Sequence, residues 1–337
     1  MKSENILRKK NGTILITGGT GTFGKAFAST LLEKFPNIHK IIIYSRDEFK
    51  QSEMAKMPEF MDNPKMRYFV GDVRDKNRLL RAFDGVDVVV HAAALKQIPS
   101  CEYNPFEAIK TNVNGAQNVI DSAIDTGVKR VVALSTDKAC QPINLYGATK
   151  LCSDKLFIAG NSYAGDKDIR FSVVRYGNVM GSRGSVVPYF QKLIRTGAQF
   201  LPITDKQMTR FWLNLEEAID LVILALGDMV GGELYVKKIP SIKMTDLAEA
   251  LAPKLPIKVI GIRPGEKIHE MMISTDDARN TLEFPTHFII QPAFHWWTER
   301  NNHKEGKPVP SDFAYHSGNN PEWLSVQKIK VLLSGNH

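Results

Sequence analysis

Two side chains in the middle of the chain are spaced for proton transfer. Tyr146 and Lys150 are four residues apart, so on a helix they lie on the same face. A lysine ammonium close to a phenol favours the phenolate, which can accept a hydroxyl proton while a hydride leaves the same carbon. The pair therefore predicts an acid–base site that acts beside a hydride acceptor.

A polar segment, Ser135-Thr136-Asp137-Lys138, lies about ten residues before Tyr146, at the end of a predicted strand. Ligands of open α/β sheets bind outside the carboxyl ends of the strands. We therefore expect one cleft to hold the five candidate catalytic residues, Thr136, Asp137, Lys138, Tyr146 and Lys150. No His, Cys and Asp spacing in the sequence suits a metal site, so no metal is expected.

A glycine-rich turn directly follows the first predicted strand. Gly18, Gly21 and Gly24 form the pattern G-x-x-G-x-x-G and open a helix. Glycine permits a tight turn and close approach of the backbone to a pyrophosphate, and the free N–H groups at a helix N-terminus favour anions. The strand, turn and helix together predict a dinucleotide site.

Strands and amphipathic helices alternate through the first half of the chain. The predicted strands are 13–17, 40–44, 66–70, 86–91, 130–135 and 170–175, and the predicted helices are 23–35, 77–83, 105–125, 145–159, 215–226 and 243–251. Nearly continuous Val and Ile runs indicate a parallel sheet that is covered on both faces. The expected fold is a doubly wound α/β sheet with a smaller C-terminal substrate lobe.

The rhythm of strands and helices weakens after Gly177. We expect a dinucleotide-binding domain at 10–178, with 212–237 packing back on it, and a substrate lobe from 179–211 and 238–295. The polar segment 296–337 is expected to be a C-terminal extension that forms a surface arm.

Composition excludes several classes of protein. Hydrophobic residues are 43% of the 337 residues and charged residues 24%, which excludes general disorder. Three cysteines are too few for a disulfide framework, and no apolar run reaches the ~18 residues of a membrane helix. With no secretory signal either, we expect a cytoplasmic protein without membrane contact.

The chain is basic, with 44 Lys and Arg against 36 Asp and Glu and a formal charge of +8. A basic balance favours anionic partners. The positive residues are scattered rather than clustered in a stripe, which favours a phosphorylated small molecule over nucleic acid.

These motifs, in this order, resemble the extended short-chain dehydrogenase/reductase superfamily over about residues 12–290. The resemblance implies a Rossmann fold and a set of cofactor-binding residues. They are Thr17, Gly18, Gly21, Thr22, Phe23, Gly24, Ser45, Arg46, Lys50, Asp72, Val73, Ala92, Ala93, Ala94, Lys96, Asn112, Tyr146, Lys150 and Tyr176.

The end of the second predicted strand distinguishes the two nicotinamide cofactors. An NAD site commonly has an acidic side chain there, which bonds the ribose 2′-hydroxyl. This chain has Ser45 and Arg46, with Lys50 one turn later, and such cations suit the 2′-phosphate of NADP. The alternative is a surface arginine beside Asp47 and Glu48.

The segment from Ser135 to Lys150, STDKACQPINLYGATK, closely resembles the inverting UDP-N-acetylglucosamine 4,6-dehydratases. Their retaining cousins have Thr-Asp-Glu where this chain has Thr136-Asp137-Lys138, and larger membrane-anchored relatives have Met in place of the catalytic Tyr. The resemblance implies UDP-N-acetylglucosamine as substrate, a place in pseudaminic acid biosynthesis and flagellin glycosylation, and a homo-oligomer, either a hexamer or a dimer. The implied substrate-binding residues are Lys96, Asn178, Val187, Thr204, Met208, Arg210, Arg263 and Glu266.

The resemblance also implies a role for each catalytic residue. Tyr146 takes the proton of the C4 hydroxyl, which Thr136 holds, and Asp137 protonates the leaving C6 hydroxyl. Lys138 is the candidate base at C5, which requires its pKa to fall from ~10.4 toward working pH. Lys150 nearby favours that fall and Asp137 opposes it. The alternatives are a UDP-sugar epimerase and a non-catalytic dinucleotide-binding regulator.

Overall fold

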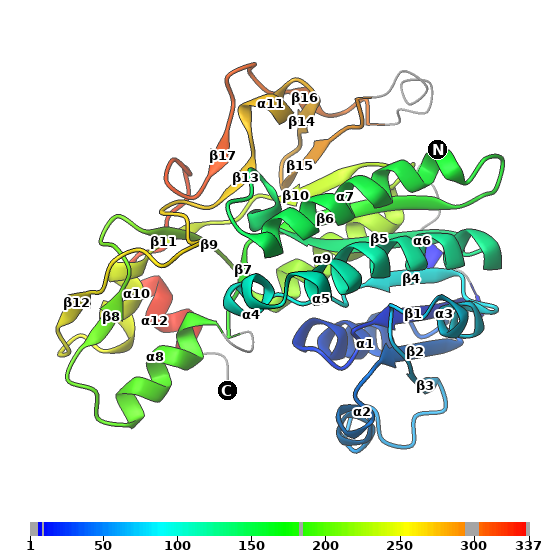
Figure 1. The fold of residues 1–337 in the computed structure, drawn as a ribbon, viewed down its shortest axis with the longest axis horizontal. Coiled ribbons are helices and arrows are strands. Elements are labelled where there is room, and N and C mark those ends of the chain that lie inside the picture. The colour runs from blue at the N-terminus through cyan, green and yellow to red at the C-terminus, as the bar shows by residue number, and fades with distance from the viewer. Residues whose placement is uncertain (1–5, 9, 182–184, 294–302, 335–337) are drawn as a thin grey trace.

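The chain folds around one ten-stranded sheet, described by a computed structural model at residues 6–8, 10–181, 185–293 and 303–334 (Figure 1). Its parallel part runs in the order β3-β2-β1-β4-β5-β6-β10. The bounds are β1 Thr13–Thr17, β2 Lys40–Ser45, β3 Met66–Val70, β4 Val88–His91, β5 Arg130–Thr136, β6 Arg170–Tyr176 and β10 Leu234–Lys237. Beyond β10 lie the antiparallel β15 His287–Ile290, β14 Thr281–Glu283 and β16 Lys307–Pro308.

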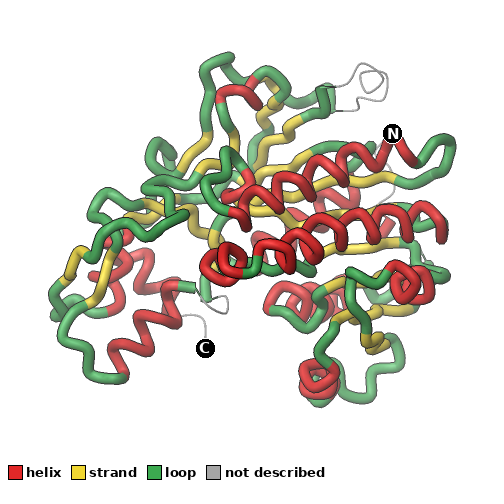
Figure 2. The backbone as a smooth tube through the Cα atoms, in the orientation of Figure 1, coloured by secondary structure: helices red, strands yellow, loops and turns green. Residues whose placement is uncertain are grey.

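Both faces of the sheet are buried, because neighbouring residues of each strand enter opposite hydrophobic clusters. Leu15 of β1 packs in the cluster of α3 Lys76–Phe83, α6 Gly115–Thr126 and α7 Leu145–Tyr163. Its neighbours Ile14 and Ile16 pack with α1 Thr22–Lys34 and α9 Leu215–Asp228. This arrangement explains the uninterrupted apolar runs and confirms the predicted doubly wound α/β fold. Figure 2 shows α6 and α7 side by side across one face of the strands.

The predicted helix 105–125 is interrupted by one wider turn. It consists of α5 Pro105–Ile109, a π-helical turn at Lys110–Asn114, and α6. Such turns occur frequently at functional sites. Among the described helices before β5, sequence patterning missed α2 Glu48–Ala55 and α4 Ile98–Tyr103, and after β6 it missed α8 Val186–Arg195, α11 Thr275–Ala278 and α12 Val326–Ser334.

A smaller lobe lies at one end of the sheet, on the left in Figure 1. Its helices are α8 Val186–Arg195, α10 Met244–Leu251 and α12 Val326–Ser334. Its strands are β7 Asn178–Val179, β8 Leu201–Ile203, β9 Thr209–Leu213, β11 Ser241–Lys243 and β12 Ile257–Val259. A separate apolar core, which includes Trp212, Ile242 and Leu247, holds the three helices together.

The C-terminal segment is not the surface arm that its polarity predicts, as far as its described residues show. β16 joins the large sheet, and β17 Tyr315–His316 pairs with β13 Met271–Ile273, which precedes α11 Thr275–Ala278. Ile329 of α12 is fully buried, and Tyr315 donates a hydrogen bond of 2.9 Å to Ile239 O. Local sequence missed this because the apolar positions of the segment are widely spaced. Residues 296–302 lie outside the described part.

Candidate active site

The catalytic candidates meet where β5 ends and α7 begins. Thr136 ends β5, and Asp137–Ala139 form one 3-10 turn. Asn144 caps α7 by accepting the amide of Gly147 at 2.8 Å. A Cβ at Gly147 would lie 2.2 Å from Lys138 O, so only glycine allows the helix to approach this turn. The absence of that side chain brings Tyr146 beside Asp137 and Lys138.

Lys138 donates hydrogen bonds to three oxygens. Its Nζ lies 3.0 Å from Asp137 Oδ1, 3.1 Å from Glu270 Oε1 and 3.4 Å from Asn178 Oδ1. Burial alone would lower the pKa of Lys138, but the two carboxylates outweigh it and raise the pKa above its usual value. This is opposite to the fall in pKa that a lysine base needs. In this state Lys138 is an ammonium without a lone pair.

Two carboxyl groups flank Lys138, and their proton affinities are pushed apart. Burial raises the pKa of Asp137, which is fully enclosed, and Glu270 adds to the rise while Lys138 opposes it. Burial would also raise the pKa of Glu270, but Lys138 and Arg210 overcome it and lower the pKa. Asp137 is therefore the better proton donor and Glu270 the better carboxylate.

The phenol of Tyr146 is held in its protonated form. Burial raises the pKa of Tyr146 to about 12, whereas Lys138 and a hydrogen bond from Thr136 favour the phenolate. The sequence assigned the cationic role to Lys150. In the structure burial lowers the pKa of Lys150, and the cation that most favours the phenolate is Lys138.

A buried network behind the site escaped the sequence analysis. Asp154 accepts Ser135 Oγ at 2.7 Å and Arg175 NH2 at 3.3 Å, and Arg175 also donates to Met272 O at 2.8 Å. Asp154 opposes the fall in the pKa of Lys150. The signal was present in the sequence, because Tyr146, Lys150 and Asp154 recur every fourth residue on one helix face. Glu270 was missed as well, although it stands four residues after the predicted substrate residue Glu266.

The glycine turn has the shape that a dinucleotide pyrophosphate needs. Gly18 has a φ of +64°, and a Cβ there would lie 2.9 Å from the backbone of Ala93. A Cβ at Gly24 would lie 2.4 Å from Gly19 O, so α1 can pack closely on β1 only with glycine. Gly21 caps α1 without a side-chain hydrogen bond, which leaves the first N–H groups of the helix for an anion. These residues fit the phosphates of a dinucleotide.

Three of the predicted cofactor contacts are enclosed by the protein itself. Thr17 Oγ1 lies 2.8 Å from His91 Nδ1 and accepts the amides of Ala92 and Ala93. Asn112 binds both backbone groups of Leu95, and its amide also donates to Thr149 Oγ1. Val73 is buried in the core. Thr17 and Asn112 therefore position the loop after β4, and Val73 packs in the core, while their predicted contacts with the cofactor stay predictions.

The end of β2 presents one arginine beside an acid. Arg46 is half-exposed, and its NH1 lies 3.8 Å from Asp72 Oδ2. Lys50 pairs with Asp47 across 2.5 Å, and Ser45 Oγ accepts a hydrogen bond from Gln51. Burial would raise the pKa of Asp72, but hydrogen bonds from Arg74 lower it. Arg46 is therefore the more loosely paired of the two predicted cations.

The remaining cofactor candidates surround the same strand ends. Thr22 and Phe23 begin α1, the run from Ala92 to Ala94 and exposed Lys96 follow β4, and Tyr176 ends β6.

The predicted substrate residues are of two kinds: polar side chains that make hydrogen bonds or ion pairs, and apolar side chains that pack in the small lobe. Glu266 accepts Thr204 Oγ1 at 3.1 Å and pairs with exposed Arg263, and Asn178 accepts from Lys138. Arg210 is mostly buried and donates to Thr209 O and Ile268 O. Val187 and Met208 pack in the core of the small lobe, and their predicted contacts with the substrate stay predictions.

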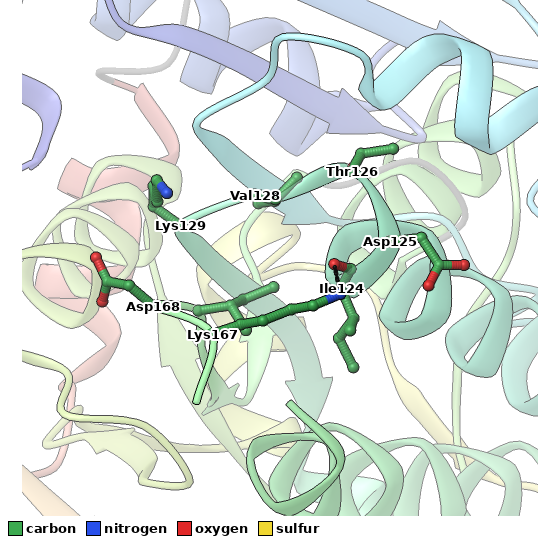
Figure 3. Close-up of a pocket in the computed structure, with 9 residues that line it drawn as sticks. Ile124, Asp125, Thr126, Val128, Lys129, Lys167 and Asp168 are labelled. Atoms are coloured by element: carbon green, nitrogen blue, oxygen red, sulfur yellow. Dashed lines mark hydrogen bonds between the residues drawn. The ribbon is translucent and has the colours of Figure 1, made fainter. Parts of the chain in front are cut away.

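A cavity of about 380 Å³ lies at the opposite end of the sheet (Figure 3). Residues 124–129 and 167–169 line it, and Lys167 Nζ donates to Ile124 O at 2.8 Å. These segments precede β5 and β6, whereas ligands of open α/β sheets bind at the carboxyl ends. This cavity is therefore separate from the catalytic candidates.

The described residues hold no group of three or more His, Cys, Asp or Glu side chains placed to bind a metal ion. Among the helices that the structure describes, none combines the length and apolarity needed to cross a membrane.

The fold and the site together define a dinucleotide-binding α/β protein with a Tyr-x-x-x-Lys acid–base site. Residues 14–292 match the family described as polysaccharide biosynthesis protein. A UDP-N-acetylglucosamine 4,6-dehydratase (inverting) of Campylobacter jejuni is 55% identical, over 98% of each chain. A UDP-glucose 4-epimerase of Rickettsia akari is 39% identical over 95% of each chain. The X-ray structure of Pen from Bacillus thuringiensis superposes with a TM-score of 0.88 at 36% identity, covering 97% of this chain and 98% of that one. The chain belongs to the polysaccharide biosynthesis protein family, within the extended short-chain dehydrogenase/reductase superfamily.

Proposed function

We propose that this protein is an inverting UDP-N-acetylglucosamine 4,6-dehydratase that carries NADP. The observation that carries the proposal is the Asp137-Lys138 pair, packed against Tyr146 by the glycine at 147. The relative named for this reaction is 55% identical, against 39% for the relative named as an epimerase. This difference supports dehydration over epimerisation.

Each residue of the site has a role that its surroundings suit. When bound, the nicotinamide supplies reversible hydride transfer. Tyr146 receives the proton of the C4 hydroxyl as a phenolate, so the phenol must first lose the proton that burial favours. Lys138 and the hydrogen bond from Thr136 favour that loss. Asp137, with its raised pKa, holds the proton that the departing C6 hydroxyl needs. Lys138 stands between the carboxyls as the candidate that acts at C5.

The proposed function is tested by incubating the purified protein with UDP-N-acetylglucosamine and following the product by mass spectrometry. We expect loss of one water from the sugar nucleotide, with no net consumption of NADP. A new isomer of unchanged mass would instead establish an epimerase. No turnover of any nucleotide sugar would point to a dinucleotide-binding regulator.

Arg46 is expected to determine the preference for NADP. Arg46→Ala should weaken NADP binding by about 1–3 kcal/mol, because the 2′-phosphate loses a charged hydrogen-bond partner. Calorimetry with NAD, which lacks that phosphate, provides the control and should show no change. Equal effects on the two cofactors, or none on NADP, would place the 2′-phosphate elsewhere.

Arg263 is expected to hold the diphosphate of the substrate, with its partner Glu266 near the uridine ribose. Arg263→Ala should raise the Kd for UDP itself about tenfold or more, since a planar guanidinium can bond two phosphate oxygens at once. Arg279→Ala, which removes an exposed arginine paired with Asp276, is the matched control. Wild-type affinity for UDP in the Arg263 variant would remove this residue from the site.

The same proposal extends to the organisation and cellular setting of the protein. The dinucleotide domain would comprise 10–178 with 212–237 and the substrate lobe 179–211 with 238–295, followed by 296–337. Within these bounds β14, β15 and β16 extend the large sheet, and α12 packs in the small lobe. We place the enzyme in the cytoplasm as a homo-oligomer, either a hexamer or a dimer, that makes the first intermediate toward pseudaminic acid for flagellin glycosylation. Light scattering of the purified protein tests the oligomeric state.

A further inference from the structure

Glu270 occupies an unusual position for an acid that the proposed reaction does not yet use. It lies just before β13, is 2% exposed, and its Oε1 is 3.1 Å from Lys138 Nζ. Within the described residues its second oxygen, Oε2, is buried without a hydrogen-bond partner. A buried, incompletely bonded carboxylate is costly, so the ion pair with Lys138 is what holds its charge.

The backbone around Glu270 fixes the carboxylate in place. Its amide donates to Ser317 Oγ at 2.9 Å, and its carbonyl accepts the amide of Ser317 at 2.8 Å. Ser317 in turn bonds Thr209 of β9 at 2.7 Å. The C-terminal segment that the sequence predicted to be a surface arm therefore holds Glu270 against Lys138.

Lys138 cannot act as a base while its three N–H groups serve Asp137, Glu270 and Asn178. One of these protons must leave before a lone pair is available. Asp137 does not serve as the acceptor, because burial raises its pKa and it already carries the proton that it gives to the leaving hydroxyl. Asn178 presents an amide oxygen, which is far too weak a base to take a proton from an ammonium group. Glu270 is the remaining acceptor within hydrogen-bond distance.

We propose that Glu270 accepts the proton that Lys138 must lose, so that the Lys138–Glu270 pair is the base at C5. The proposal rests on the proposed dehydratase function and makes Glu270 a positioning residue that acts through Lys138. One N–H bond of Lys138 breaks as an O–H bond forms on Oε1, which leaves a neutral amine and a neutral carboxyl group.

The following step balances in atoms and electrons. The amine takes the C5 hydrogen as a proton, and the electron pair of that C–H bond becomes the C5–C6 double bond. The C6–O bond breaks, and the hydroxyl leaves as water with the proton of Asp137. Lys138 is then an ammonium again, Glu270 is protonated and Asp137 is ionised. C5 then takes a proton from water on the other face. The Lys138–Glu270 pair gives its extra proton to solvent and Asp137 takes one from solvent, which restores the site.

Several charged groups face this pair from the surrounding elements. Asp137 precedes Lys138, and the phenol of Tyr146 lies near it on α7. Arg210 of β9 has its Nε 3.8 Å from Glu270 Oε1, and Lys267 also favours the carboxylate form of Glu270. These cations keep Glu270 ionised in the resting site, so Oε1 carries no proton and can receive one, although the same cations make the transfer from Lys138 uphill.

The test is the pH dependence of elimination in Glu270→Gln, a variant of the same shape. Wild-type elimination should change little between about pH 6.5 and 8.5, because the proton transfer is internal. The variant should be about 100-fold slower at neutral pH, the scale of one acid–base group. Its rate should then rise about tenfold per pH unit, because Lys138 must lose its proton to solvent. Glu270→Asp should recover part of the rate and flatten the profile.

A second measurement needs no sugar nucleotide. NMR of protein with isotope-labelled lysine side chains, assigned by comparison with Lys138→Arg, reports the pKa of Lys138 directly. We expect a lower pKa in Glu270→Gln than in the wild type, and no change in Glu233→Gln, which removes a buried acid paired with His303. This result is independent of whether the protein dehydrates any sugar.

Some outcomes would overturn the proposal. A loss of rate in Glu270→Gln that is equal at every pH would show a purely structural role, and an unchanged rate or an unchanged pKa of Lys138 would exclude the proton transfer. If Glu270→Gln does not fold, the slope of the Glu270→Asp profile decides. A wild-type protein that removes no water from any nucleotide sugar overturns the proposed function, and the role at C5 with it.

Discussion

Replacing Tyr146 by Phe is expected to slow turnover of UDP-N-acetylglucosamine by about 10²–10⁴-fold, the range for loss of one acid–base group. The phenol is the side chain bonded by Thr136, and without its oxygen nothing at that point accepts the C4 proton. Binding of UDP should be unchanged, since no phosphate contact is lost. Stopped-flow absorbance of the reduced cofactor should show that the first oxidation itself is lost.

Tyr163 provides the matched control for this substitution. It lies at the other end of α7 and is 60% exposed, so Tyr163→Phe removes the same atom from the same helix outside the site. We expect its rate to equal that of the wild type. A Tyr146→Phe enzyme that keeps more than a tenth of the wild-type rate would mean that another group accepts the C4 proton.

Much of the fold follows from local sequence because its strands are buried on both faces. The run at 13–17 is predicted with its observed bounds, as a buried parallel strand leaves no polar alternation to confuse its ends. The edge strand at 66–70 also has its predicted bounds, although only Met66 in it is buried. The C-terminal segment could not be predicted in this way. Its buried positions, such as Tyr315 and Ile329, contact elements far away in the sequence, and no local period records such contacts.

Local patterns and long-range contacts differ in the same way at the candidate active site. Gly18, Gly24 and Tyr146 were found because each carries a local signature, either a turn that needs glycine or a helical spacing. Glu270 was not found, because its importance comes from meeting Lys138 across the fold. The direction of the pKa shift of Lys138 also needed the structure. The sequence places Asp137 beside Lys138, but only the fold places the second carboxylate, Glu270, on its other side.

Replacing Lys138 separates oxidation at C4 from the loss of water. Lys138 stands where the retaining cousins described in the sequence analysis have Glu. We expect Lys138→Ala to bind cofactor and still oxidise C4, so that reduced cofactor accumulates, while loss of water falls by about 10²–10⁴-fold. Lys155→Ala, which changes an exposed residue of α7, should behave as the wild type.

Deuterated water then reveals which face of C5 receives the proton. The wild-type enzyme should place solvent deuterium at C5 with inverted configuration and carry the original C4 hydrogen to C6, because the hydride never exchanges with solvent. Lys138→Arg, which keeps the charge and cannot become a neutral amine at working pH, should be as slow as Lys138→Ala. NMR of the product at early times decides the outcome, since a later slow isomerisation would obscure it. A product with only the retained configuration at C5 would return the chain to the retaining class, and a fast Lys138→Arg enzyme would show that charge alone suffices at this position.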